Sequence, residues 1–365
     1  MRWGARNDRE VLMAANGSAG ILLLLTVFAW PNGPAGSAKE NAELVKITDQ
    51  VYASISNPDG NAVGNAGILV LDRSVLVFDT HFTPEAGQAL LNQVRSITPK
   101  PVRYVVNSHA HADHTHGNQV FEGAQLISSL NARNGILETD IPSLERTMGI
   151  ARSQIQKLRR ELDAEGNRAQ AQRYREQIES RQQYLANLSR LRILAPSVTL
   201  EERLTLKEGN QEVRLLFLGE GHTNGDIVLL LPAAKIAFLG DLFFNEAIPN
   251  VQDANILNWM DTLVNVLKLE AETFVPGHGV VGDRKAVSRF LAYFQELKSL
   301  VEPAVARGDT LEQAIQAVQL PAKYSAYRFQ NLFPANVQKM YAELKTLEAE
   351  AGPKGEASKT NVKGK

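Results

Sequence analysis

The pattern of apolar and polar residues predicts two blocks of β-strands along the chain. In the first block, Asp72 and Arg73 form a turn between two apolar runs, which is typical of a hairpin. Thr83 followed by Pro84 predicts the start of an amphipathic helix that extends to about residue 97. A second helix is expected at 254–268. The runs that predict strands lie at residues 44–47, 51–55, 67–71, 74–80, 101–107, 213–218, 227–231, 236–239 and 273–275.

Residues 139–192 separate the two blocks and show a helical period. Apolar residues recur at helical spacing on both sides of a break at AEGN, residues 164–167, so we expect an antiparallel helical hairpin. Residues 150–192 contain ten Lys or Arg and five Asp or Glu. This excess is typical of a solvated helical face and is also compatible with a docking surface. A lid over a cleft is a further hypothesis, because the hairpin interrupts the chain between loops that carry histidine.

The N-terminal residues 1–38 have the composition of an export signal. Three arginines precede an apolar stretch at residues 21–30, and small residues lead up to Ala38, after which we expect cleavage. An uncleaved membrane anchor is the alternative, although the apolar stretch is shorter than the ~20 residues that a membrane span needs. In both cases the folded part is expected to be exported, either periplasmic or secreted, and to meet the membrane only through this segment.

At 365 residues the chain is long for one domain, so one core with appendages is the expected plan. We expect the core domain at residues 39–283, helices at 284–351 and a disordered tail at 352–365, which has almost no apolar residues. The net charge of −1 provides no basic field for nucleic acid, and a small, near-neutral substrate fits better. The sequence does not reveal the oligomeric state.

The stretch SHAHADHTHGN, residues 108–118, holds four of the seven histidines. Three further loops, GHTNGD, GD and PGHG, each follow a predicted strand within a few residues, as His109 does. Because strand ends can meet at one rim of a layered sheet, we expect these loops to share one space. The chain has no cysteine, so any metal there is held by nitrogen and oxygen. The candidate ligands are His109, His111, Asp113, His114, His222, Asp241 and His278.

Seven ligands are too many for one tetrahedral zinc and suit two, with water completing each coordination shell. In an extended segment His109, His111 and Asp113 point to one side, while His114 can reach a neighbouring ion. The alternatives are a His-rich surface tract and a set of structural histidines. Both account poorly for six histidines and an aspartate that gather in strand-end loops.

The motifs HAHADH, GHTNGD, GD and PGHG resemble those of the metallo-β-lactamase superfamily. The resemblance covers about residues 44–283 apart from the hairpin, and it implies an α+β fold, a four-layer αββα sandwich. It also implies two Zn²⁺ ions: one held by His109, His111 and His222, the other by Asp113, His114 and His278, with Asp241 bridging. The segment GDLFFNEAIPN and the later Trp259 look most like exported zinc hydrolases of the quinoprotein-relay and sulfur-oxidation type.

The resemblance implies attack by a zinc-bound hydroxide, with Asp113 as the catalytic residue that orients it and accepts its proton. Asp79 could orient a metal-binding imidazole through its other ring nitrogen, or could simply end a strand. His116 and His81 could contact substrate or serve as structural histidines. Asn245 could donate to an oxyanion or hold its own loop.

The expected activity is hydrolysis of an ester, thioester, lactone or amide bond, with a β-lactam among the candidate amides because hydroxide held by two zincs can attack any strained carbonyl. Hydrolysis of β-lactams does not carry over from the resemblance, because the commonest subclass of those enzymes has a cysteine where Asp241 stands. One alternative is a mononuclear iron sulfur dioxygenase of the same superfamily. The other is a binding protein that uses this fold without catalysis.

Overall fold

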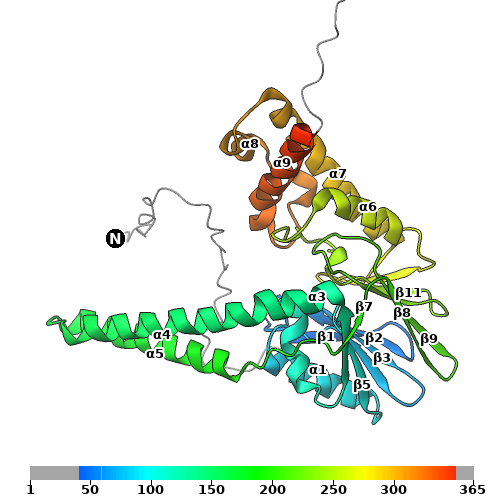
Figure 1. Ribbon diagram of the computed structural model, residues 1–365, viewed down its shortest axis with the longest axis horizontal. Coiled ribbons are helices and arrows are strands. Elements are labelled where there is room, and N and C mark those ends of the chain that lie inside the picture. Colours follow the sequence, from blue (N-terminus) through cyan, green and yellow to red (C-terminus); the bar gives the residue numbers. More distant parts are fainter. Residues whose placement is uncertain (1–40, 59, 351–365) are drawn as a thin grey trace, which may run out of the picture. The chain divides into compact units, whose positions relative to one another are not determined.

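The computed structural model describes residues 41–58 and 60–350 (Figure 1). The expected export signal at 1–38 and the expected tail at 352–365 lie outside the described residues. The described part contains two β-sheets and the helices that cover them. Among these residues, no helix is both long enough and apolar enough to cross a bilayer.

The first sheet has seven strands that pair in chain order. Strands β1 to β4 pair antiparallel, and β4 to β7 continue as parallel neighbours. The strands are β1 (Ala42–Lys46), β2 (Val51–Ser56), β3 (Ala66–Val70), β4 (Val75–Phe78), β5 (Val102–Val106), β6 (Gln125–Ser129) and β7 (Val198–Leu200).

The second sheet has six strands in the order β13-β12-β11-β10-β9-β8. All its neighbours pair antiparallel except β11 and β12, which are parallel. The strands are β8 (Arg203–Glu208), β9 (Gln211–Leu216), β10 (Val228–Leu231), β11 (Ile236–Phe238), β12 (Thr273–Val275) and β13 (Gly282–Asp283).

Alternation along the strands produces the layers. In β10, Leu229 and Leu231 join Leu76 and Phe78 of the first sheet in a cluster between the sheets. Val228 and Leu230 point the other way and pack with helices. Because successive side chains point to opposite faces, each sheet buries both of its faces. Helix α1 (Pro84–Ile97) covers the first sheet, and α6 (Ile256–Val266) and α7 (Arg284–Arg307) cover the second. The predicted αββα sandwich is confirmed.

The C-terminal helices continue the outer layer of the second sheet. Helix α8 (Leu311–Ala317) starts with a capping box formed by Thr310 and Gln313, and α9 (Phe333–Glu350) follows two 3₁₀ turns, Ala322–Tyr324 and Gln330–Leu332. Val337 and Met340 of α9 lie in the same apolar cluster as Phe274 of β12. These helices therefore share a core with the sheet, and Figure 1 shows α9 beside α7 and α8.

Helices α4 (Ile141–Asp163) and α5 (Arg168–Arg190) form the hairpin and lie side by side in Figure 1. Asn167 caps α5, and a small cluster of Ile155, Leu158 and Ile178 joins the two helices. The hairpin is entered through α3 (Leu130–Gly135) and a π-helical turn, Ile136–Asp140. Because the seam is narrow, most basic side chains of the hairpin face solvent.

Pattern analysis did not assign four strands, β6, β7, β8 and β13. β7 has three residues and β13 has two, and β6 is QLISS, whose two serines weaken the apolar signal. β8 is RLTLKE, in which Leu204 and Leu206 alternate with polar residues. This alternation is a local strand signal that the pattern analysis overlooked.

Candidate metal centre

The candidate ligands come from loops that follow strands of both sheets. His109, His111, Asp113 and His114 follow β5, and the short helix α2 (Ala112–Thr115) carries the last two; a 3₁₀ turn, His116–Val120, continues it. His222 follows β9, Asp241 lies in a 3₁₀ turn (Gly240–Leu242) after β11, and His278 follows β12. The structure brings all seven side chains into two adjacent groups.

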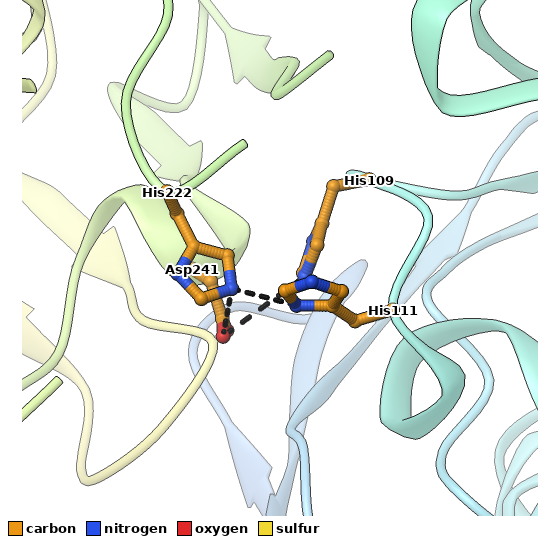
Figure 2. A group of neighbouring side chains, drawn as sticks. All are labelled: His109, His111, His222 and Asp241. Carbon is orange, nitrogen blue, oxygen red and sulfur yellow. Dashed lines mark hydrogen bonds and ion pairs between the residues drawn. The ribbon is translucent and has the colours of Figure 1, made fainter. Parts of the chain in front are cut away.

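The first group contains His109, His111, His222 and Asp241, with one potential ligand atom from each side chain within 4.8 Å of the others. Figure 2 shows the three imidazoles and the carboxylate directed toward one another. His222 Nε2 lies 2.8 Å from His111 Nδ1 and 3.2 Å from Asp241 Oδ2. His109 Nε2 lies 4.0 Å from the same Asp241 oxygen.

The second group contains Asp113, His114 and His278. Asp113 Oδ2 lies 3.2 Å from His278 Nε2 and 3.4 Å from His114 Nε2. Asp241 reaches this group as well, because its Oδ1 is 3.1 Å from His114 Nε2 and its Oδ2 is 3.3 Å from His278 Nε2. Asp241 therefore stands between the two groups.

Each imidazole of the first group has a partner for its outward nitrogen. His111 Nε2 faces Asp253 Oδ2 at 2.8 Å, and His222 Nδ1 faces the Asn250 carbonyl at 3.1 Å. His109 Nδ1 faces Ser108 Oγ at 2.8 Å. An oxygen acceptor at the outward nitrogen places the proton there and leaves the inward nitrogen with its lone pair free for a cation.

Asp79 supports one histidine in each of the two groups. Its Oδ1 accepts from the Ser108 amide at 2.7 Å, and its Oδ2 accepts from Ser108 Oγ at 2.8 Å. The same Oδ2 lies 2.9 Å from His114 Nδ1. Burial raises the pKa of Asp79, while the His114 charge and these donors favour the carboxylate. Asp79 thus supports His114 directly and His109 through Ser108.

The electrostatics differ from one imidazole to the next. Burial opposes a charge on His111, but Asp253 and neighbouring carboxylates outweigh it and raise its pKa. Burial lowers the pKa of His222 to about 3, and burial together with neighbouring imidazoles holds that of His109 well below its usual value. Burial also opposes a charge on His278, but Asp241 and Asp113 outweigh it and raise its pKa to about 9. Burial disfavours ionised Asp241, yet the surrounding imidazoles, His278 foremost, hold its pKa well below the usual range. The buried carboxylates therefore favour a positive charge, such as that of a cation, between them.

The donor set fits divalent cations. Within the described part of the chain, four buried site atoms have no hydrogen-bond partner, namely His109 Nε2, His114 Nε2, Asp241 Oδ1 and His278 Nδ1. The first three point into the groups, and burial of polar atoms without partners is costly. Imidazole nitrogens and carboxylate oxygens without thiolate suit zinc and related divalent ions.

Two glycines allow the loops to approach the groups closely. A Cβ on Gly277 would lie 1.9 Å from Asp241 Oδ1, and a Cβ on Gly64 would lie 2.8 Å from His114 Nε2. Asn65, next to Gly64, donates to the carbonyls of Pro276 and Gly279 at 2.9 Å each. It therefore holds the loop that carries His278 from both sides.

The structure places three other candidate residues outside both groups. His116 Nε2 lies 3.1 Å from Asp140, at the root of the hairpin. His81 is enclosed between Ser54 Oγ at 3.1 Å and the Gly64 carbonyl at 2.7 Å, and burial lowers its pKa to about 4. Asn245 donates its side-chain amide to the Val280 carbonyl at 2.8 Å. These partners favour structural roles for all three side chains.

Sequence reasoning did not identify Ser108, Asp253, Asn65 or the Asn250 carbonyl. Ser108 directly precedes the histidine cluster and Asn65 directly precedes a strand, so a local signal existed for both. No local signal existed for Asp253 or Asn250. The partner of Asp253 is His111, 142 residues away, and the partner of Asn250 is His222, which lies in a different loop.

Comparison with known proteins links these loops to one family. A family model described as "Metallo-beta-lactamase superfamily" matches residues 59–129 and 155–278. The unmatched interval falls on α3, the π-helical turn and the first part of α4. Both parts of the match together contain all seven candidate ligands.

Two curated relatives illustrate the range of similarity. A "Metallo-beta-lactamase type 2" from Bacillus cereus is 38% identical over 94 residues, which are 24% of this chain and 37% of that protein. A "Linear primary-alkylsulfatase" from Pseudomonas sp. (strain ATCC 19151) is 22% identical over 264 residues, 69% of this chain and 49% of that protein. The chain thus spans half or less of the length of these relatives.

A solved structure shares the fold. It is described as "Metallo-beta-lactamase from Pontibacter korlensis" and aligns with a TM-score of 0.51 at 21% identity. The alignment covers 70% of this chain and 99% of that one. At this identity the match supports the architecture alone.

Proposed function

The chain belongs to the metallo-beta-lactamase superfamily, and on that premise we propose that it is an exported hydrolase that holds two zinc ions. The proposed substrate is a small molecule with an ester, thioester, lactone or amide bond. Export is proposed from the composition of residues 1–38. One observation carries the proposal of two ions: Asp241 lies between two complete groups of donors, within 3.3 Å of histidines in each.

His109, His111 and His222 would hold one ion, and Asp113, His114 and His278 the other, with Asp241 contacting both. Two such ions lower the pKa of a bound water toward ~7 and polarise the oxygen of the scissile bond. The chain itself supplies orientation, because Asp79, Asn250 and Asp253 hold the outward nitrogens of the imidazoles.

Asp113 is the proposed proton acceptor. Its carboxylate lies within 3.4 Å of two imidazoles, and its side chain is 20% exposed, so substrate and water can reach it. His278 and His114 hold its pKa well below the usual range against the effect of burial. The carboxylate is therefore ionised at neutral pH, and its proposed role as proton acceptor rests on its position between the two imidazoles and its exposure to water.

Aromatic side chains pack against His278, a member of the second group. Phe244 stacks on its ring at 4.9 Å, and Phe329 meets it edge-on at 5.9 Å. Val280, two residues further, is 54% exposed. Phe244 is buried, so the half-buried Phe329 and the exposed Val280 are the surfaces that suit a substrate with an apolar part beside the scissile group. A primary alkyl sulfate is a second candidate, favoured by the 264-residue similarity to the alkylsulfatase.

Elemental analysis of the purified full chain tests the metal proposal. About two zincs per chain would support it, one iron would support the dioxygenase alternative, and no metal would support a binding protein. The assay panel for the zinc form is a β-lactam, a lactone, a thioester, a phosphodiester and a primary alkyl sulfate.

Matched histidine variants test the ligand assignment. His114→Ala should lose one ion and most of the activity, whereas His116→Ala, two residues along, should keep both ions. Asp241→Ala should weaken both ions. Equal metal loss in the His114 and His116 variants would contradict the assignment.

A further inference from the structure

We propose that helix α9 positions two histidines of the first metal group by holding loop 249–255 at both ends. The C-terminal helices would then be part of the metal centre. The inference rests on the proposed function only in assuming that the first group binds a metal ion.

Loop 249–255 provides the outward partners of two imidazoles. The Asn250 carbonyl lies 3.1 Å from His222 Nδ1, and Asp253 Oδ2 lies 2.8 Å from His111 Nε2. These contacts determine which nitrogen of each ring carries the proton, so they direct His222 Nε2 and His111 Nδ1 inward. A shift of this loop would therefore misplace two donors of one group.

Asn336 of α9 holds the first end of the loop. It is fully buried, and its side-chain amide donates to the Pro249 carbonyl at 3.0 Å and to the Leu332 carbonyl at 2.9 Å. Its Oδ1 accepts from the Tyr293 hydroxyl of α7 at 2.8 Å. With three hydrogen bonds in the core, Asn336 has a fixed orientation and places Pro249 directly before Asn250.

Glu343, two turns further along α9, holds the other end. Its carboxylate accepts from the backbone amides of Ile256 at 2.9 Å and Leu257 at 3.0 Å. These amides lie in the first turn of α6, where they have no partner within the helix. A negative charge at this end also interacts favourably with the helix dipole. The Asn255 amide donates to the Gly221 carbonyl at 3.0 Å, which ties this end of the loop to the residue before His222.

Packing supports both attachments. Val251 and Ala254 are buried in the same cluster as Val337 and Met340 of α9. The loop is therefore held by apolar contacts on its inner side, while Asp253 projects to the surface with a side chain that is 55% exposed. The attachment points lie on α9, and the contacts with the imidazoles lie between them.

The second group has different support. His114 faces Asp79, and Asn65 holds the loop of His278. Neither residue belongs to α9 or to loop 249–255. A change in α9 should therefore weaken one ion selectively.

The experiment measures affinities for Zn²⁺ in the full chain by competition with a chromophoric chelator. Glu343→Gln and Asp253→Ala should weaken one of the two ions by about 10–100-fold, the usual effect of losing such a partner, and leave the other unchanged. Asp253→Asn keeps an acceptor oxygen and should recover most of the affinity. Tyr341→Phe is the matched control, because its hydroxyl, also on α9, bonds the Asp309 carbonyl and not the loop.

A second readout follows the mechanism directly. Nitrogen chemical shifts of the metal-free protein, recorded at alkaline pH where the imidazole is neutral, should show the His111 proton on Nε2 in the wild type and a mixture of tautomers in Asp253→Ala. Asp253 is largely exposed, so this variant should fold, with circular dichroism as the check.

The outcomes distinguish a failure of the proposed function from a failure of the proposed role of α9. A wild type that binds no metal would refute the proposed function. A wild type that binds two ions, with wild-type affinities in both Glu343→Gln and Asp253→Ala, would refute only the role of α9. Equal weakening of both ions in Glu343→Gln would also refute it.

Discussion

Replacement of Asp79 by Asn should weaken the contribution of His114 to metal binding in the second group. Asp79 has a positive φ of 60°, a conformation that Asn tolerates, so the backbone should keep its course. The amide oxygen can still accept from the Ser108 backbone at the position of Oδ1. The amide NH₂ then replaces Oδ2 and meets His114 Nδ1 with a donor. His114 must place its proton on Nε2, the nitrogen that faces the second group.

The size of the effect follows from the lost contact. The Asp79 Oδ2 to His114 Nδ1 distance is 2.9 Å, and both side chains are 1% exposed or less. A hydrogen bond to a charged group contributes about 1.5–3 kcal/mol. Since 1.4 kcal/mol is a tenfold change in an equilibrium constant, the second ion should bind ~10–150-fold more weakly.

Zinc titration of the Asp79→Asn and Ser108→Ala variants provides the assay. Ser108→Ala removes the hydroxyl that faces His109 Nδ1 but leaves the contact between Asp79 and His114, so it should weaken mainly the first ion. Wild-type affinity for both ions in Asp79→Asn, or the same pattern of loss in both variants, would refute the reasoning.

Four further outcomes are expected. Gly277→Ala should weaken binding of both ions and lower the free energy of unfolding, because its Cβ would lie 1.9 Å from Asp241 Oδ1 and 2.7 Å from the Gly240 backbone; metal analysis and thermal unfolding followed by circular dichroism check this. Gly149→Ala has open space within α4 and should stabilise that helix by about 1 kcal/mol, seen as slower amide exchange confined to the hairpin. Removal of zinc by a chelator should lower the free energy of unfolding by ~2.7 kcal/mol for each bound ion, relative to zinc at a hundred times its Kd, with recovery on readdition. Deletion of residues 145–190 should speed turnover of large substrates if the hairpin is a lid, and unchanged turnover of large and small substrates alike would dismiss the lid.

The nature and location of the candidate metal donors were predictable from the sequence. His109, His111 and Asp113 alternate after an apolar strand, and the other donors stand in short loops after strands. Side-chain chemistry and strand-end position are local properties, so the pattern indicates them directly. The αββα architecture followed from the resemblance carried by the same motifs.

Local pattern did not decide whether His116 and His81 contact substrate or serve as structural histidines. Both follow strands within a few residues, and only the packed structure shows His116 facing Asp140 and His81 enclosed between Ser54 and the Gly64 carbonyl.

By itself, the sequence determined which side chains can bind metal and that they lie at strand ends, since residue identity and periodicity are written along the chain. Only the tertiary structure decided that Asp241 stands between both groups and that His111 is oriented by Asp253, 142 residues away. It also decided that α9 contacts loop 249–255, which lies beside His111 and His222. The physical reason is that a hydrogen bond depends on distance and direction in space, and contacts between distant segments leave no period or spacing in the sequence.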